Sequence, residues 1–169
     1  MLPDRSLPRP TFADVFADES LSGVESWIKG LESKIDAYRY SQFKSGLPDG
    51  DRTLRDLLLS LAQGTQSPLT MVSNLQTVLA WPVDDDLYAA LKSATVYVES
   101  STLRRRTIEW VMKSGMRFHP KAGEEVTFFD TTRNTNRRGK IASVDRPVAA
   151  AVVQVGDTKI VVEAERIVA

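Results

Sequence analysis

The spacing of apolar residues changes near Gly115, and this change constrains the fold more than any other feature of the sequence. Before Gly115, apolar residues recur every three or four positions, as on one face of an α-helix. After it, apolar and polar residues alternate and valine is frequent, as in β-strands. The sequence therefore predicts an α+β protein in three parts: an extended Pro-rich arm over residues 1–20, a helical domain over 21–115 and a small barrel over 119–169.

The helical domain is predicted to be a bundle of four to five helices. The first firm helix is expected to begin at Ser22, because Glu25 follows at the spacing of a capping box, and to end at Gly46. Before it, only a short turn capped by Thr11 is expected. The stripe that this helix is expected to bury consists of Val24, Trp27, Ile28, Leu31, Ile35 and Tyr38.

The later helices are expected to begin at residues that commonly cap helices. Thr53 is predicted to cap the second, Ser67 with Pro68 the third and Asp84 the fourth. The polar run 100–102 can break the fourth helix and cap a fifth, so one helix and two helices both remain open for residues 85–114. The faces expected to be buried contain Leu54, Leu57, Leu58, Leu61, Met71, Val72, Leu75, Val78, Leu79, Leu87, Leu91, Ala94, Val98, Ile108, Val111 and Met112.

Five short antiparallel strands are predicted to follow, with a polar loop over 131–138 and a tight turn at Gly156. The alanine-rich third strand is placed between Pro147 and Gly156, because only eight residues fit there and valine favours a strand. Since closing a sheet removes its exposed edges, these strands indicate a small barrel. The predicted strands are 125–130, 139–145, 148–155, 158–163 and 167–168.

Residues 123–168 resemble the SH3-like small barrels, most closely the KOW-type barrels of ribosome- and transcription-associated proteins. Gly139 opens the second strand, Ile141 follows two positions later, and a turn at Glu165 and Arg166 precedes the last strand. The resemblance implies an SH3-like barrel, and such barrels bind RNA, DNA, peptides or other protein domains. Residues 1–115 resemble no family, while the whole chain resembles small helical-plus-barrel proteins common in phage genomes.

Charge is unevenly distributed along a chain whose net charge is zero. Residues 1–103 have a net charge of −5, residues 104–140 of +6 and residues 141–169 of −1. The middle segment is therefore a candidate patch for phosphates, and the alternative is a solvated surface that pairs with the acidic helical part. The candidate residues for binding nucleic acid or an acidic protein surface are Arg104, Arg105, Arg106, Lys113, Arg117, Lys121, Arg133, Asn134, Asn136, Arg137, Arg138 and Lys140.

The sequence lacks the residues that several classes of enzyme and metal site need. The chain has no cysteine and His119 is its one histidine, which excludes thiolate chemistry and a multi-histidine metal site within one chain. No nucleotide-binding, hydrolase or metalloprotease motif is present. The run Asp84, Asp85 and Asp86 could ligate Mg²⁺, but consecutive carboxylates on a helix diverge, so helix capping is favoured. We expect no catalytic residue, metal or cofactor.

The sequence is therefore interpreted as a non-catalytic binding protein. Its basic face, formed by a helix over 104–117 and the loop 131–140, is expected to engage nucleic acid or a nucleoprotein complex. The alternative is a structural or interaction protein, such as a virion component, an adaptor or an inhibitor of a host complex, that docks through the barrel and the arm. No apolar run approaches the ~20 residues of a membrane span, so a cytoplasmic location, or a virion for a phage protein, is expected; the oligomeric state stays open.

Overall fold

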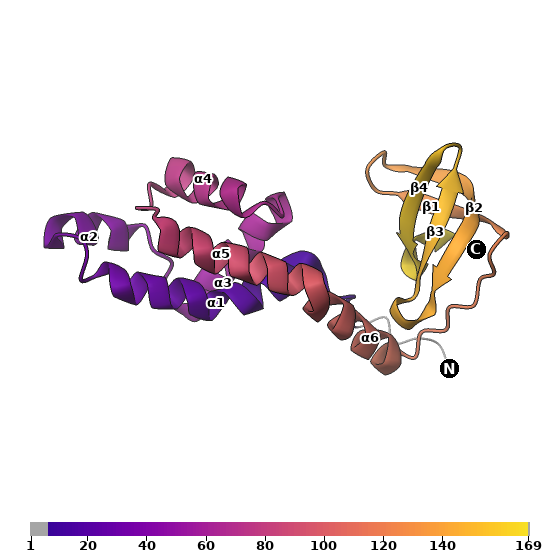
Figure 1. Cartoon of the computed structure of the whole chain (residues 1–169), viewed down its shortest axis with the longest axis horizontal. Coiled ribbons are helices and arrows are strands. Elements are labelled where there is room, and N and C mark those ends of the chain that lie inside the picture. The colour runs from indigo at the N-terminus through magenta and orange to yellow at the C-terminus, as the bar shows by residue number, and fades with distance from the viewer. Residues whose placement is uncertain (1–6, 169) are drawn as a thin grey trace. The chain divides into compact units, whose positions relative to one another are not determined.

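A computed structural model describes residues 7–168, which divide into two compact units. The helical unit comprises Pro10–Arg105, and the sheet unit joins the described residues 7–9 of the arm to residues 106–168. Each unit has a hydrophobic core of its own. Helices come first along the chain and strands follow (Figure 1), so the predicted α+β class is confirmed.

Two of the predicted helix starts are confirmed by their hydrogen bonds. The Ser67 hydroxyl accepts from the Thr70 amide at 3.4 Å, and the Asp84 carboxylate accepts from the Leu87 amide at 2.9 Å. The α-helices of the described residues are α1 (Phe12–Leu31), α2 (Ala37–Ser45), α3 (Gly50–Gly64), α4 (Pro68–Leu79), α5 (Asp85–Tyr97) and α6 (Leu103–Ser114).

The predicted start of the first helix at Ser22 is wrong, because α1 begins ten residues earlier, at Phe12. Thr11 and Asp14 form a reciprocal capping box there, whereas Ser22 lies inside the helix. An extended arm over 1–20 is therefore also wrong from residue 12 onward, and the part of the arm at 1–6 lies outside the described residues. A capping-box spacing inside a longer helix has the same sequence signature as a true helix start.

The first helix is also shorter at its end than predicted. It stops at Leu31, and Asp36 caps a separate helix, α2, by accepting from the Arg39 amide at 2.9 Å. Ile35 thus lies in the connection, and Tyr38 is 72% exposed on α2. In the sequence, the spacing of three or four residues between apolar positions continues past the end of α1, because Ile35 and Tyr38 keep the spacing of the residues before them.

Three further expectations for the helices are wrong. Thr53 does not cap α3, which begins at Gly50; its hydroxyl instead donates to the Asp49 carbonyl. Val78 on α4 and Met112 on α6 are 76% and 77% exposed rather than buried. A helical repeat identifies a face of the helix, but not how far along that face another element covers it.

Residues 85–114 form one uninterrupted helical run. A π-helical turn over Val98–Thr102 joins α5 to α6, and the Leu103 amide donates to the Val98 carbonyl five residues back. Val98 and Thr102 are both buried at this turn. The polar residues at 100–102 therefore widen the helix by one residue instead of ending it.

Three aromatic rings pack against one another in the helical unit's core. The Trp27 ring lies 5.7 Å from that of Trp81 and 5.9 Å from that of Phe43. The Trp27 Nε1 donates to the Asp84 carboxylate at 2.8 Å, the same oxygen that caps α5. The start of α5 is thereby fastened to α1.

The sheet unit holds one antiparallel sheet with the strand order β4-β3-β2-β1-β5. Its core consists of Phe128, Ile141, Ala151, Val153 and Val162. A 3₁₀ turn, Ala164–Arg166, precedes the last strand as expected, and another, Arg146–Val148, follows β2. The strands are β1 (Glu125–Asp130), β2 (Thr135–Asp145), β3 (Ala150–Val155), β4 (Thr158–Glu163) and β5 (Ile167–Val168).

The boundaries predicted for β1, β4 and β5 are confirmed, while those of β2 and β3 are wrong. The expected polar loop over 131–138 shrinks to a turn over 131–134, because β2 already begins at Thr135. The third strand begins at Ala150 rather than at residue 148. Polar and arginine side chains can continue a strand when its other face is buried, which composition alone does not reveal.

Backbone pairing leaves the sheet open. No pairing joins β4 to β5 within residues 7–168, so these two strands are its edges and the predicted closure of the barrel is not observed. Gly139 on β2 lies in close contact with β3. A Cβ atom there would lie 2.6 Å from both the Gln154 carbonyl oxygen and Val153 Cγ1, so only glycine fits without a shift of the backbone.

Candidate nucleic-acid interface

The two faces of β2 separate the arginines and amides that the sequence placed in one loop. Arg137 lies opposite Phe128, which is fully buried, and so belongs to the inner face of the sheet. Asn136, Arg138 and Lys140 alternate with it and are exposed on the outer face. The candidate residues on β2 therefore divide into one inward and three outward side chains.

Arg137 forms an ion pair inside the sheet unit. Its guanidinium donates to the Asp130 carboxylate at 3.0 Å, and the two side chains are 19% and 7% exposed. Asp130 also accepts from the backbone amides of Thr132 and Arg133. The hydrogen bond from Arg137, with these two amide bonds, holds the pKa of the Asp130 carboxyl below its ordinary value. Arg137, one of the candidate binding residues, is therefore engaged within the sheet unit.

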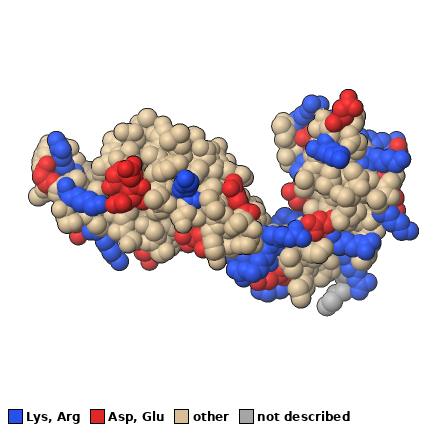
Figure 2. All heavy atoms as spheres, viewed as in Figure 1, with Lys and Arg blue, Asp and Glu red and all other residues tan. Residues whose placement is uncertain are grey.

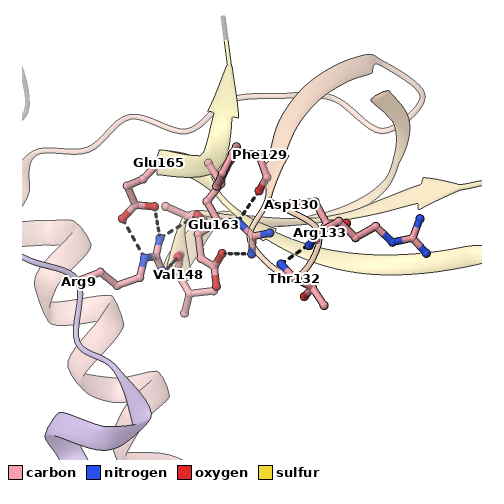
Figure 3. Close-up of polar contacts among 10 residues, drawn as sticks. Arg9, Phe129, Asp130, Thr132, Arg133, Val148, Glu163 and Glu165 are labelled. Carbon is pink, nitrogen blue, oxygen red and sulfur yellow. Dashed lines mark hydrogen bonds and ion pairs between the residues drawn. The ribbon is translucent and has the colours of Figure 1, made fainter. Parts of the chain in front are cut away.

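The turn between β1 and β2 exposes both of its candidate residues, Arg133 and Asn134. Asn134 adopts a left-handed backbone with φ of 51°, a conformation that asparagine tolerates better than most residues. Arg133 is held through its backbone amide, and its side chain points away from the other labelled residues in Figure 3. Asn134 thus shapes the turn, while the Arg133 guanidinium is available at its surface.

One acidic side chain faces the two cations on the outer face of β2. Arg138 lies 3.4 Å from Glu125 in a pair whose side chains are 75% and 65% exposed. Lys140 is the cross-strand partner of the same Glu125, and its ammonium forms no ion pair with another described residue. An exposed pair of this kind is worth about 0–1 kcal/mol and is screened by salt. Arg138 and Lys140 together therefore leave a positive surface.

The remaining candidates lie on α6 and the segment after it. Arg104 and Arg105 belong to the helical unit and are exposed, Arg106 is half-buried in the sheet unit, and all three take part in interactions. Figure 2 shows Lys and Arg side chains spread over the visible surface of the part that holds the strands. Three further exposed cations of the sheet unit form no ion pair with another described residue: Lys113, Arg117 and Lys121.

Arg9 is a residue of the sheet unit that the sequence did not single out. Its guanidinium forms a bidentate pair with Glu165, at 2.9 and 3.0 Å, and also donates to the carbonyls of Val148 and Ala149 (Figure 3). Five guanidinium hydrogens in one plane permit this set of contacts. No sequence motif signals it, because Arg9 and Glu165 are 156 positions apart.

Trp110 on α6 completes the attachment of the arm. The Arg9 guanidinium lies 4.8 Å from the centre of the Trp110 ring, and the Trp110 indole donates to the Leu7 carbonyl at 2.8 Å. Trp110 is 8% exposed, so it is a packing residue and not a surface contact. The described end of the arm is therefore fastened to its own unit.

The acidic run at the start of α5 is explained by structure. Asp84 caps the helix, and Asp86 pairs with Lys34 at 2.8 Å, a hydrogen bond that raises the pKa of Lys34. Across residues 7–168, no three His, Asp or Glu side chains gather where they could hold a metal ion. His119 is exposed between α6 and β1.

Comparison of the chain with protein-family models, with curated proteins and with solved structures finds no match in any of the three. Within the described part of the chain, no helix combines the length and the apolar character needed to cross a membrane.

Proposed function

We propose that the protein is a non-catalytic binding protein and that its sheet unit engages nucleic acid through the phosphate backbone. The contact surface is the outer face of β2 with the preceding turn, where Arg133, Asn136, Arg138 and Lys140 are all exposed. The observation that carries this proposal is the division of β2 into two faces, with Arg137 neutralised inside and the neighbouring cations directed outward. Exposed Lys and Arg side chains bind phosphates by releasing condensed counterions.

The charge of each unit supports the choice of the sheet unit. Residues 106–168 contain 11 basic and 8 acidic residues, whereas residues 10–105 contain 9 basic and 13 acidic. An anionic ligand is therefore attracted to the sheet unit and repelled by the helical unit. Asn136, between Arg138 and the turn, adds an amide that can donate to phosphate oxygens or to base edges.

An SH3-like character of the sheet unit belongs to the same proposal. A strand order of β4-β3-β2-β1-β5, with a 3₁₀ turn before β5, is compatible with the layout on which the resemblance depends. The alternative is a structural or interaction protein that docks through the barrel and the arm. Docking through the arm is less well supported, because Leu7 and Arg9 are engaged within their own unit.

The test is the fluorescence anisotropy of labelled single-stranded RNA, single-stranded DNA and duplex DNA, measured with the full chain over a series of salt concentrations. We expect the double variant R138A/K140A to bind more weakly than the wild type. The slope of log affinity against log salt should fall by about two units, roughly one for each lost phosphate contact.

The matched control is K29A/K44A, which removes two exposed lysines from the helical unit and should leave both affinity and slope unchanged. Equal losses of affinity in the two double variants would mean that only the net charge of the protein matters. That result would contradict binding at a defined surface. Absence of binding to all three probes at low salt would reject the nucleic-acid proposal.

A further inference from the structure

Strand β4 is a free edge of the sheet along its whole length. It pairs with β3 on one side over all six residues without a register shift, and the sheet ends there. It contains no proline, and Val161 at its centre is 61% exposed. A regular edge strand presents unpaired N–H and C=O groups that another strand can join. The edge is therefore suited to pairing with a further strand.

The outward side chains of β4 are a cation, an apolar residue and an anion in sequence. Lys159, Val161 and Glu163 alternate with Ile160 and Val162, of which Val162 is fully buried in the core. Lys159 forms no ion pair with another described residue. The outer face of the edge thus has opposite charges placed symmetrically about Val161.

We propose that two copies of this chain associate edge to edge through β4. In the antiparallel register centred on Val161, Lys159 of each copy lies opposite Glu163 of the other, and the two Val161 side chains face each other. Ile160 then lies opposite Val162 on the inner face. Opposite charges and apolar residues in direct cross-strand positions stabilise an antiparallel pair.

The charges on β4 favour this register. They also favour a second copy of this chain as the strand that pairs with β4. Centring the pair on Lys159 would place two lysines opposite each other, and centring it on Glu163 would place two glutamates opposite each other, both of which are destabilising. Glu163 already accepts from Arg166 at 3.1 Å through one carboxylate oxygen. Since a carboxylate has a second oxygen, it can accept Lys159 of the second copy as well.

The association has a geometric consequence for the surface of the sheet. An antiparallel pair of identical strands is isologous, and its two-fold axis is perpendicular to the joined sheet. The outer faces of both copies, with Arg138 and Lys140 on each, then lie on one side of a continuous sheet. The dimer itself does not depend on nucleic-acid binding, so the two proposals fail separately.

Sedimentation equilibrium of the full chain, without nucleic acid, tests the association. The wild type should show a concentration-dependent rise from 18.8 kDa towards twice that mass. K159E alone and E163K alone should each weaken self-association by at least about tenfold, because each brings like charges together twice. Mixing the two variants in equal amounts should restore a dimer, since each copy then supplies the charge that the other needs.

The matched control is K121E, a charge reversal at an exposed lysine outside the sheet. It should associate like the wild type, and far-UV circular dichroism should show that all variants are folded. If E163K unfolds through loss of its Arg166 contact, E163Q is mixed with K159E instead. This mixed pair has one Lys159–Glu163 contact and no like charges opposite each other, so it should associate more strongly than K159E alone. A wild type that stays monomeric up to roughly 1 mM, or a K159E variant that associates like the wild type, overturns the proposal.

Discussion

Two neighbouring arginines on β2 have opposite environments, although the sequence presents them as equivalent. Arg137 is paired with Asp130 on the inner face, and Arg138 lies on the outer face beside Glu125. We expect R138A to change the free energy of unfolding by about 1 kcal/mol or less. R137A should cost several times more, because it leaves Asp130 with its main partner removed. Thermal melts of the two variants provide the measurement, and equal effects would contradict an internal role for Arg137.

The same ion pair predicts a dependence on pH. The pKa of Asp130 is lowered in the folded state, chiefly by the hydrogen bond from Arg137. Its contribution to stability is therefore present above the unfolded pKa of about 3.9 and is lost as pH falls through the lower folded value. We expect the gap in Tm between the wild type and D130N to be widest near neutral pH and to close below about pH 4. A gap that stays constant from neutral to acid pH would contradict the lowered pKa.

Two glycines should respond to alanine with opposite signs. At Gly139 a Cβ would lie 2.6 Å from a backbone carbonyl oxygen, so G139A should destabilise by about 1–3 kcal/mol. At Gly30, inside α1, nothing lies within 4 Å of the added atom. G30A should stabilise by about 0.4–1 kcal/mol, since it reduces the freedom of the unfolded chain. Chemical denaturation of both variants measures whether the free energy of unfolding falls for G139A and rises for G30A.

For the helices, two leucine substitutions distinguish the buried stripe from the exposed faces. Leu31 is 3% exposed at the end of α1, and Leu69 is 68% exposed on α4. L31A should destabilise by about 2–5 kcal/mol through lost burial and the cavity it leaves. L69A removes the same atoms from a solvated site and should change stability by no more than about 0.5 kcal/mol. Denaturant titration of each variant measures the difference, and a loss below 1 kcal/mol for L31A would mean that α1 is not packed as described.

Which elements the sequence predicts depends on how local their signals are. Ser67 with Pro68, Asp84 and the turn at Gly156 act on residues two to four positions away, and all three were located correctly. The start of α1, the break before α2 and the start of β2 were not. In each of these cases the local sequence pattern was compatible with two different structures, and packing against distant residues decided which one formed.

Across the whole molecule, Arg9 connects the start of the chain to its end. It binds Glu165 and two carbonyls near β3, and it lies over Trp110. R9A should destabilise the sheet unit by about 2–3 kcal/mol, because charged hydrogen bonds are lost. Amide hydrogen exchange should therefore accelerate in the strands and stay unchanged in α1 and α3.

The control for this prediction is R146A, which removes an exposed arginine of the same unit that forms no ion pair with another described residue. Exchange in its strands should match the wild type. Faster exchange throughout both units of R9A would mean that the arm stabilises the entire chain and not the sheet unit alone.

By itself, the sequence determined the order of helices and strands, most of the core positions and the concentration of positive charge after residue 103. These features could be predicted because periodicity and charge are properties of neighbouring residues. Only the tertiary structure decided that Arg137 faces inward while Arg138 faces outward, that Arg9 binds Glu165 and that β4 is left as a free edge. These outcomes depend on which strands pair and in which register. A shift of one residue in register exchanges the two faces of a strand, and the amino-acid composition does not show which register forms.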